Sequence, residues 1–349
     1  MIRQPAETQT LYAELSERLR AHEAARTFAS LSGSFAKKRV NEGNYWYFKT
    51  SEGAAGQREY FVGPDDGPTQ EIINSYLAGR PEAEAELAQI ERLCAMLRHG
   101  GAMLTDTPSA RVISGLASAG VFQLGAVLVG THAFIALGNL LGVRWESALR
   151  TQDIDLAASR VLHLIVPQSD ADLPKSMDAL NMGFLPVPGL NPTEPATSFK
   201  VRGQALRVDL LTPSSGPRDD RPVFISRLKA AAQPLEMLDY LLESPVPAPL
   251  LNGGATLVNV PDPARFALHK LIISGRRQVF EQVKSMKDRQ QATEVIMALF
   301  EDRRGDLALA AERLNTRPSG WRARLKRELT KLDDVTENAR KFILRNMAD

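Results

Sequence analysis

The sequence predicts an α+β fold, and three observations lead to that prediction. The apolar run Val127–Val129 ends at Gly130 and Thr131, after which the chain has the pattern of a buried helix. Several short β-rich runs follow, two of which carry aspartates. From Pro263 onward the chain has helical periodicity throughout. Runs of strands followed by runs of helices are typical of the α+β class.

Composition limits the possible classes of protein. The 349 residues suffice for two domains or one large decorated domain. A hydrophobic share of 44% and a charged share of 24% are typical of a globular chain rather than a disordered one. The net charge of +2 excludes a generally polybasic surface, so any nucleic-acid binding would need local patches. The single cysteine, Cys94, excludes a disulfide framework and a cysteine-rich zinc site, and we expect it to pack in a helix.

Neither a signal segment nor a membrane span is predicted. Residues 1–7 lack the basic-then-apolar pattern of a signal peptide, so we expect a cytoplasmic protein. Residues 121–143 are mostly apolar and could be mistaken for a membrane span. Glycines, Thr131, His132 and Asn139 interrupt them, which predicts instead a buried strand, a glycine turn and a buried helix.

Residues 1–100 are expected to form an N-terminal helical and β-hairpin module. Leucines at helical spacing predict a helix over residues 6–31. The β-rich runs Lys37–Phe48 and Arg58–Val62, joined by a glycine-containing loop, predict a hairpin. A second helix is predicted over residues 69–99, which are rich in Glu and Ala.

The core is expected at residues 101–262 and a helical region at residues 263–349. The core should contain helices at 107–119, 131–141, 171–182 and 235–242, strands at 127–129, 154–157 and 161–166, and hairpins turned at Gly203-Gln204 and Asn252-Gly253. Breaks in the C-terminal helices are expected at Gly305 and at Pro318–Gly320. Loops at residues 186–192 and 213–222 are candidates for the border of a cleft.

Three aspartates are candidates for a metal site. Asp153 and Asp155 lie two residues apart on a predicted strand, so their side chains share a face about 7 Å apart at the backbone. Asp209 interrupts the apolar run Val208–Leu211, where burying a carboxylate is costly unless it has a metal or a partner. Such carboxylates on neighbouring strands would provide a site for Mg²⁺, or Mn²⁺, and a nucleoside triphosphate. The alternative for the first two is a turn or helix N-cap.

Gly130 and Thr131 stand where a phosphate could bind. A glycine and a hydroxyl at a strand-to-helix turn let the backbone approach a phosphate, and N–H groups at the helix start point toward it. The alternative role of Thr131 is that of helix N-cap, which is compatible with phosphate binding. We expect His132 to be packed or supporting rather than a metal ligand.

These motifs, in this order, resemble the DNA-polymerase-β-like nucleotidyltransferase superfamily. Its signature is Gly-Gly or Gly-Ser, then Asp-x-Asp or Asp-x-Glu, then a third acid, and Thr131 keeps the hydroxyl of the usual serine. The strings Gly-Thr-His-Ala-Phe and Thr-x-Asp-Ile-Asp are similar to those of a bacterial subgroup related to the AbiE-type abortive-infection toxins. The later segments Phe266–Leu271, Arg276-Arg277 and Lys287-Asp288 resemble the helical part of that subgroup. The resemblance covers roughly residues 100–300.

The resemblance implies a mixed-sheet core and an enzyme that moves a nucleoside monophosphate from a triphosphate to an acceptor hydroxyl. It implies that Asp153, Asp155 and Asp209 ligate Mg²⁺, with Asp209 beside the incoming hydroxyl. The first alternative is a catalytically silent relative, which binds nucleic acid or an antitoxin-like protein in a defence or toxin–antitoxin system. The second is an unrelated metal-dependent phosphohydrolase, which is disfavoured because the five histidines form no cluster in the sequence.

Two sets of cations are candidates for binding phosphate. Lys270 and Arg277 lie seven residues apart on a predicted helix, hence on one face, where they could hold a triphosphate or simply be solvated. Lys37, Lys38 and Arg39 precede an aromatic run that contains Trp46, a combination that suits RNA. Alternation sends Tyr45 and Tyr47 to one face and Trp46 and Phe48 to the other, and one face is expected to be core. The RNA would then be the acceptor, and a tRNA-like molecule is expected. The basic helix after Pro318 is a further candidate for RNA binding or a solvated face.

Overall fold

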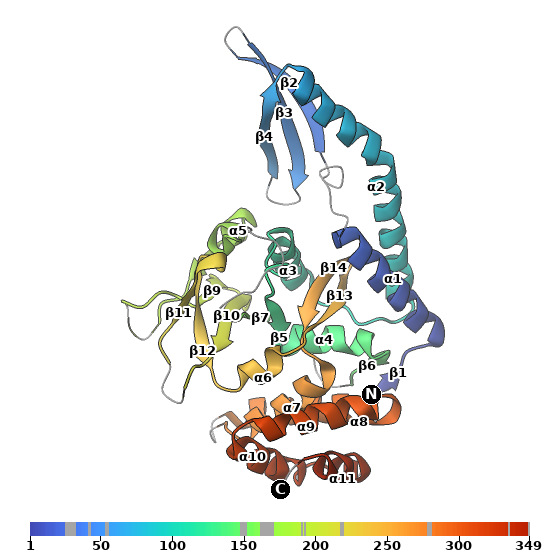
Figure 1. Ribbon diagram of the computed structural model, residues 1–349, viewed down its shortest axis with the longest axis vertical. Coiled ribbons are helices and arrows are strands. Elements are labelled where there is room, and N and C mark those ends of the chain that lie inside the picture. Colours follow the sequence, from blue (N-terminus) through green and yellow to red (C-terminus); the bar gives the residue numbers. More distant parts are fainter. Residues whose placement is uncertain are drawn as a thin grey trace.

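The computed structural model has the predicted α+β architecture, with a central mixed sheet, a projecting N-terminal sheet and a group of C-terminal helices (Figure 1). It describes residues 1–24, 33–40, 43–52, 56–146, 152–160, 171–189, 191, 193–216, 220–277, 281–333 and 336–347. The expected strand at 161–166, and residues 25–31 of the first expected helix, lie outside these ranges.

The central sheet is mixed, and its strand order is β11-β12-β10-β7-β5, with β8 and β9 attached beside β10. Its strands are β5 (Val127–Val129), β7 (Asp153–Ala157), β8 (Phe184–Pro186), β9 (Ser198–Val201), β10 (Arg207–Pro213), β11 (Val223–Ile225) and β12 (Ala230–Leu235). Strand β10 runs parallel to β7 and β12, whereas β5 is antiparallel to β7 and β9 is antiparallel to β10. Alternate residues of β7 and β10 are buried, among them Ile154, Leu156, Val208 and Leu210, so one face of these strands packs on the core.

Helix α4 (Gly130–Leu140) is the predicted buried helix after β5. Its residues Ala133–Leu137 are at most 3% exposed, and the Phe134 ring stacks on Trp145 with centroids 4.6 Å apart. The hairpin β13 (Val246–Asn252) and β14 (Gly254–Val260) packs on α4. The other helices of the core are α3 (Thr107–Ser118), which contacts α5 (Leu173–Ala179), and α6 (Leu238–Leu242). In the part of the chain that the structure describes, no helix is long and apolar enough to cross a membrane.

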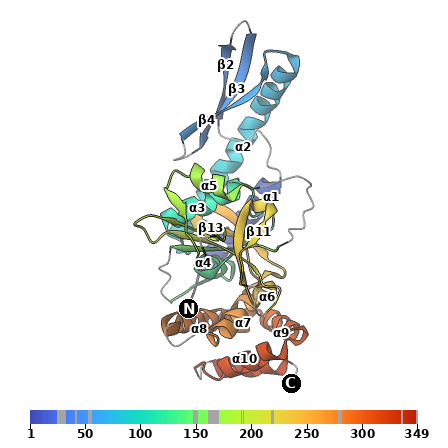
Figure 2. The ribbon, with the colours of Figure 1, turned by 90° about the vertical axis from the view of Figure 1, so that its left-hand side faces the viewer.

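The C-terminal helices pack together below the sheet in Figure 1 and in the turned view of Figure 2. They are α7 (Pro263–Ser274), α8 (Gln282–Asp302), α9 (Arg304–Arg313), the short 3-10 helix η5 (Leu314–Thr316), α10 (Ser319–Leu329) and α11 (Glu337–Arg345). The break predicted at Gly305 falls instead at Arg303, whose backbone leaves the helical region at φ −139° and ψ 47°. Pro318 precedes α10 as predicted, because its ring suits the start of a helix and not its interior.

The N-terminal module contains α1 (Ala6–Ala24), the strands β2 (Gly33–Val40), β3 (Gly43–Glu52) and β4 (Gly56–Pro64), and the long helix α2 (Gly67–His99). The prediction of one strand over Lys37–Phe48 is wrong. The run is divided between β2, which ends at Val40, and β3, which begins at Gly43, so the described part of this sheet has three strands. A further small pair joins β1 (Ile2–Arg3) to β6 (Val143–Arg144).

The sheet β2–β4 stands away from the core at the far end of α2 (Figures 1 and 2). It packs on the first part of α2 through Phe35, Phe48 and Tyr76, whose ring centroids lie 5.1–5.3 Å apart. The last turns of α2 pack with α1 and Leu251 of β13, through side chains such as Ile90. Between Tyr76 and Ile90 the helix rises by about 20 Å, at roughly 1.5 Å per residue.

Two other predicted helices are shorter than expected. The segment predicted at 171–182 is helical only over α5, since Asn181 has a left-handed backbone (φ 50°). The segment predicted at 235–242 begins at Leu238, because Leu235 ends strand β12, which pairs with β10. The hairpins turned at Gly203-Gln204 and at Asn252-Gly253 are confirmed.

Candidate active site

The three predicted aspartates lie at the beginning of two neighbouring parallel strands. The register of β7 and β10 places Asp155 opposite Asp209 and Asp153 opposite Arg207. The residues between them in each strand are buried, so these four side chains share the other face of the sheet. Because neighbouring strands lie about 4.8 Å apart, the Asp155 and Asp209 carboxylates are within reach of one ligand.

The turn between β5 and α4 brings Gly130 against the same carboxylates. Val129 is paired with Asp155 across the sheet, and Gly130 follows with a left-handed backbone (φ 68°). A Cβ atom at Gly130 would lie 2.1 Å from Asp155 Oδ2, so only glycine leaves room for this carboxylate. The Gly-Thr and Asp-x-Asp motifs of the sequence therefore lie side by side in the structure.

Thr131 is not the N-cap of α4, contrary to the alternative interpretation of the sequence. The N-cap position is occupied by Val129, which offers no side-chain hydrogen bond to the helix. The first N–H groups of α4 are thus without a side-chain cap, which suits an anion at this helix start. The Thr131 hydroxyl instead accepts a hydrogen bond from Lys287 Nζ of α8 at 3.1 Å.

Lys270 and Arg277 converge on a single buried carboxylate. Asp288, which is 3% exposed, accepts hydrogen bonds from Lys270 Nζ and Arg277 Nε, each at 2.7 Å. The side chain of Lys270 is only 12% exposed, so the alternative of a solvated helix face is wrong for it. Lys287, next to Asp288, is half-buried, and its pKa is lowered by burial and by Lys270. This cluster joins α7 and α8 beside Thr131.

Asp209 is held by two residues that the sequence analysis did not identify. Its Oδ1 atom accepts hydrogen bonds from Ser198 Oγ of β9 and, at 2.7 Å, from Arg207 Nε. Arg207 also donates to Ser198 Oγ at 2.8 Å. The position of Arg207 two residues before Asp209, on the same face of β10, was the available signal.

Negative charge is concentrated at these strands. Burial, and then repulsion from Asp209, raise the pKa of Asp155 to about 7. Carboxylate oxygens are the donors that Mg²⁺ and Mn²⁺ prefer, and a divalent cation would relieve this repulsion, so the three aspartates fit such an ion. Across the described ranges, no three His, Cys, Asp or Glu side chains are already arranged around a common point for a metal. Both bonds that Asp209 accepts from Ser198 and Arg207 go to its Oδ1 atom.

His132 is buried in the first turn of α4. It is 1% exposed, and its Nδ1 lies 2.6 Å from the Thr105 hydroxyl. Burial lowers its pKa to about 4, so the imidazole is neutral at neutral pH. This is the packed histidine expected from the sequence.

The candidate nucleic-acid residues lie elsewhere, on the projecting sheet (Figure 1). Lys37 is paired with Asp65, and Lys38 with Glu59 at 2.5 Å. Trp46 Nε1 donates to Asp65 at 2.8 Å, while Arg39 is exposed on β2. The structure therefore does not bring these residues to the aspartates.

A pocket of about 670 Å³ adjoins the Asp288 cluster. It lies between the ends of β10 and β12 and helix α7, and its lining includes Ser214, Leu235, Leu238, His269, Arg276 and Arg277. Arg277 both lines this pocket and bonds Asp288. Ser214 follows Asp209 by five residues, roughly 16 Å along the strand.

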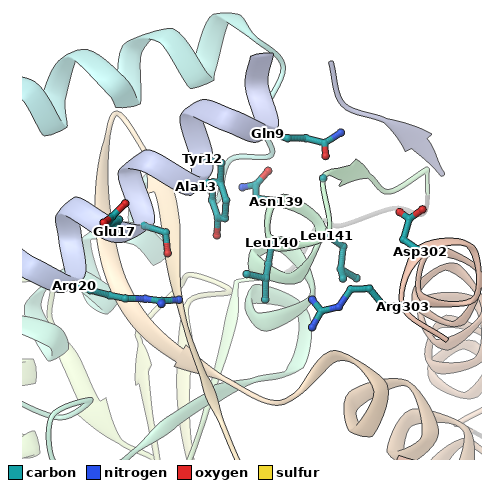
Figure 3. A pocket seen from close by; sticks show the side chains of 13 residues that line it. Gln9, Tyr12, Ala13, Glu17, Arg20, Asn139, Leu140, Leu141, Asp302 and Arg303 are labelled. Atoms are coloured by element: carbon teal, nitrogen blue, oxygen red, sulfur yellow. The ribbon is translucent and has the colours of Figure 1, made fainter. Parts of the chain in front are cut away.

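Figure 3 shows a second pocket, of about 650 Å³, between α1, the end of α4 and the end of α8. It lies at the C-terminal end of α4, about 15 Å along the helix from Gly130. Gln9, Tyr12 and Asn139, which line it, each donate a hydrogen bond to a backbone carbonyl. The second pocket is therefore separate from the aspartates.

A family model described as nucleotidyltransferase matches residues 107–315, more than half of the chain, including both aspartate strands and the Asp288 cluster. No curated protein matches. Among solved structures, the chain is similar to an antigenic nucleotidyltransferase-like protein from Paracoccidioides brasiliensis, with 18% identity, 64% of this chain and 95% of that chain covered, and a TM-score of 0.33. By the extent of the family match, this chain belongs to the nucleotidyltransferase family.

Proposed function

We propose that the protein transfers a nucleoside monophosphate from a nucleoside triphosphate to an acceptor hydroxyl and releases pyrophosphate. One observation carries the proposal. Asp155 and Asp209 are paired in register on parallel strands, and the Asp155 carboxylate lies against the Gly130 turn that begins α4. Carboxylates and an uncapped helix start thereby meet at one place, as phosphoryl transfer requires.

In the proposed reaction the acceptor oxygen attacks the α-phosphorus. A bond forms between these two atoms, and the bond from the α-phosphorus to the bridging oxygen of the β-phosphate breaks. The hydroxyl proton passes to the carboxylate of Asp209, and pyrophosphate leaves with the electron pair of the broken bond. Arg207 and Ser198 orient Asp209 until the substrates bind.

Asp153, Asp155 and Asp209 are the residues that would hold Mg²⁺ or Mn²⁺. When bound there, such an ion neutralises charge that develops on the attacking and leaving oxygens. The contribution of the chain is to keep three carboxylates on one sheet face and to leave Gly130 without a Cβ atom in their way.

The phosphate tail of the nucleotide is assigned to the start of α4. The Thr131 hydroxyl and the free N–H groups of this turn would bind the terminal phosphates, with Lys287 supplying charge. Lys270 and Arg277 add positive charge near this site, and their ion pairs with Asp288 fix the position of both side chains. The pocket beside Arg277 would receive a further part of a substrate.

Lys287→Met is expected to raise the KM for the nucleotide about tenfold or more and to change kcat less. The substitution keeps the length of the side chain but removes a charge-assisted hydrogen bond to phosphate, which contributes about 1.5–3 kcal/mol. Steady-state kinetics with saturating acceptor measures the effect. Lys284→Met, an exposed lysine three residues earlier on α8, is the matched control and should leave KM unchanged. Equal KM values for the two variants would remove Lys287 from phosphate binding.

The acceptor is proposed to be RNA, in a cytoplasmic enzyme related to the AbiE-type toxins. The alternative is a silent nucleotidyltransferase that binds RNA or an antitoxin-like protein without chemistry. The ion pair between Arg207 and Asp209 favours this alternative, since the guanidinium supplies the positive charge that a metal ion would otherwise supply to this carboxylate.

A label-transfer experiment distinguishes the active enzyme from the silent protein. The purified full chain is incubated with each α-labelled nucleoside triphosphate, Mg²⁺ or Mn²⁺, and whole-cell RNA or whole-cell protein. We expect label in one acceptor fraction and its loss on chelation of the metal. Nucleotide binding by calorimetry, with no labelled product for any combination, would decide for the silent protein.

A further inference from the structure

One face of the projecting sheet is opposite to the face that packs on α2. Tyr45, Tyr47 and Phe61 lie together on it, with the Phe61 ring centroid 6.0 Å from that of Tyr45 and 5.6 Å from that of Tyr47. Lys38 Nζ lies 5.2 Å from the centre of the Tyr47 ring, and Phe61 is 60% exposed. We call Lys38, Tyr45, Tyr47 and Phe61 the outer face.

The opposite side of the sheet already supplies the packing. Phe48, 2% exposed, and Phe35 contact Tyr76 of α2, whose hydroxyl also bonds the Gly33 carbonyl. On the outer face Phe61 is exposed, and the Tyr45 and Tyr47 rings beside it are half-buried. An aromatic group that includes an exposed ring is typical of a surface that binds a partner.

From this surface we infer that the outer face docks single-stranded nucleic acid. The inference deepens the proposed function and rests on it in one respect, namely that the acceptor is RNA. Aromatic rings beside cations are the usual platform for unpaired bases, because every base has a face that stacks and every nucleotide carries a phosphate. A duplex hides its base faces and would gain only the charge contacts.

The charge of the projecting sheet favours single-stranded nucleic acid as the partner. Strands β2, β3 and β4 contain five basic residues and two acidic ones, a formal charge of +3, against +2 for the whole chain. Helix α2, which carries the sheet, contains three basic residues and five acidic ones, a formal charge of −2. The positive charge is thus concentrated on the sheet, where Lys38 lies on the outer face beside Tyr47 and Lys37 lies on the other face beside Trp46. The pairs that Lys37 and Lys38 make with acids are exposed, and such pairs exchange readily for phosphate.

The distance between the projecting sheet and the core favours a polymer as the partner. The exposed stretch of α2 separates the sheet from the core by about 20 Å. A small-molecule acceptor bound among the aspartates cannot also touch the outer face. An RNA strand can place its reactive hydroxyl at Asp209 and an unpaired stretch on Tyr45, Tyr47 and Phe61.

Within this inference, stacking is assigned to residues other than the predicted Trp46. Trp46 bonds Asp65 through its indole N–H and is neighboured by Lys37 rather than by the outer rings. Tyr47 and Phe61 take its place as stacking residues, while Lys38 keeps its predicted role.

The test measures binding without turnover. A fluorescein-labelled 20-nucleotide RNA of mixed sequence, the same RNA as a duplex, and single-stranded DNA are titrated with the full chain by fluorescence anisotropy at several salt concentrations. The protein carries Asp155→Asn throughout, so that no transfer takes place. Phe61→Ala and Tyr47→Ala are compared with Phe224→Ala, a phenylalanine that is also 60% exposed but lies on β11 of the central sheet.

We expect the two outer-face variants to weaken binding of single strands by on the order of five- to a hundredfold, the range for loss of one stacked base. The Phe224→Ala variant should bind as the parent does, and the duplex should bind more weakly than the single strand. RNA binding over DNA would show that the 2′-hydroxyl is read as well.

Three results would overturn the inference: no binding at low salt, binding unchanged by both outer-face substitutions, or a preference for the duplex. A preference for the duplex would indicate that charge alone drives binding. The absence of binding at low salt would favour a protein as the partner of the projecting sheet. The proposed function is judged separately. Transfer to some other acceptor with no RNA binding refutes only the docking surface, whereas RNA binding without any transfer by the wild type refutes only the enzyme.

Discussion

Asp155→Asn is expected to abolish nucleotide transfer, by at least about a hundredfold, without harming the fold. The amide has nearly the volume of the acid but lacks its charge, and removal of one preorganised electrostatic group costs about that much in rate. Asp155 lies opposite Asp209 and two residues after Asp153. Removing its charge relieves repulsion among these carboxylates, so the midpoint of thermal unfolding should stay level or rise.

Activity and stability are measured on the same sample, so that a loss of catalysis is distinguished from a loss of folding. Label transfer and thermal unfolding are recorded for the wild type, for Asp155→Asn and for the control Asp178→Asn. Asp178 is an exposed carboxylate on α5, so the control should match the wild type in both assays. Transfer at the wild-type level by a folded Asp155→Asn protein would remove this residue from the chemistry.

The aspartates could be found in the sequence because each one breaks a strong pattern. A carboxylate within a β-rich apolar run is costly, so such residues stand out against their neighbours. Their pairing could not be found in the same way. Asp155 and Asp209 are 54 positions apart, and only the register of β7 with β10 shows that they lie side by side.

Lys287 and Arg207 show why part of the site could not be predicted. Lys287 is one of several cations on a helix, and its contact with Thr131 joins residues 156 positions apart. The resemblance singles out the string Lys287-Asp288, but nothing in the local sequence shows which residue Lys287 contacts, and Lys284 on the same helix is exposed. Strand β12 was missed for a different reason, since its alanines and Pro234 have low β propensity and pairing with β10 decides its structure.

On the projecting sheet, periodicity correctly indicated which side chains share a face. Alternation placed Tyr45 with Tyr47 and Phe48 on the other side, and the structure agrees. Which of the two faces is covered depends on α2, and Tyr76 of that helix packs against Phe48. The sequence could also not show that Phe61, from another strand, completes the outer face.

Gly130→Ala is expected to lower transfer by about a hundredfold and to destabilise the fold as well. Two separate effects add at this position. The left-handed backbone (φ 68°) costs any residue with a Cβ atom about 1–2 kcal/mol. The new methyl group would also lie 2.1 Å from Asp155 Oδ2, so the carboxylate must move, and a displacement of about 1 Å in a catalytic group costs on the order of a hundredfold in rate.

Gly183→Ala separates these two effects. Gly183 has a similar backbone (φ 74°), but a Cβ atom there meets nothing within 4 Å. Urea unfolding of both variants should show a loss of about 1–2 kcal/mol for Gly183→Ala, which is the backbone cost alone, and a larger loss for Gly130→Ala. Label transfer should be near normal for Gly183→Ala and nearly absent for Gly130→Ala. If the two alanine variants lose equal stability and both keep transfer, the Asp155 carboxylate does not depend on the space that Gly130 leaves open, and the assignment of this turn to the active site fails.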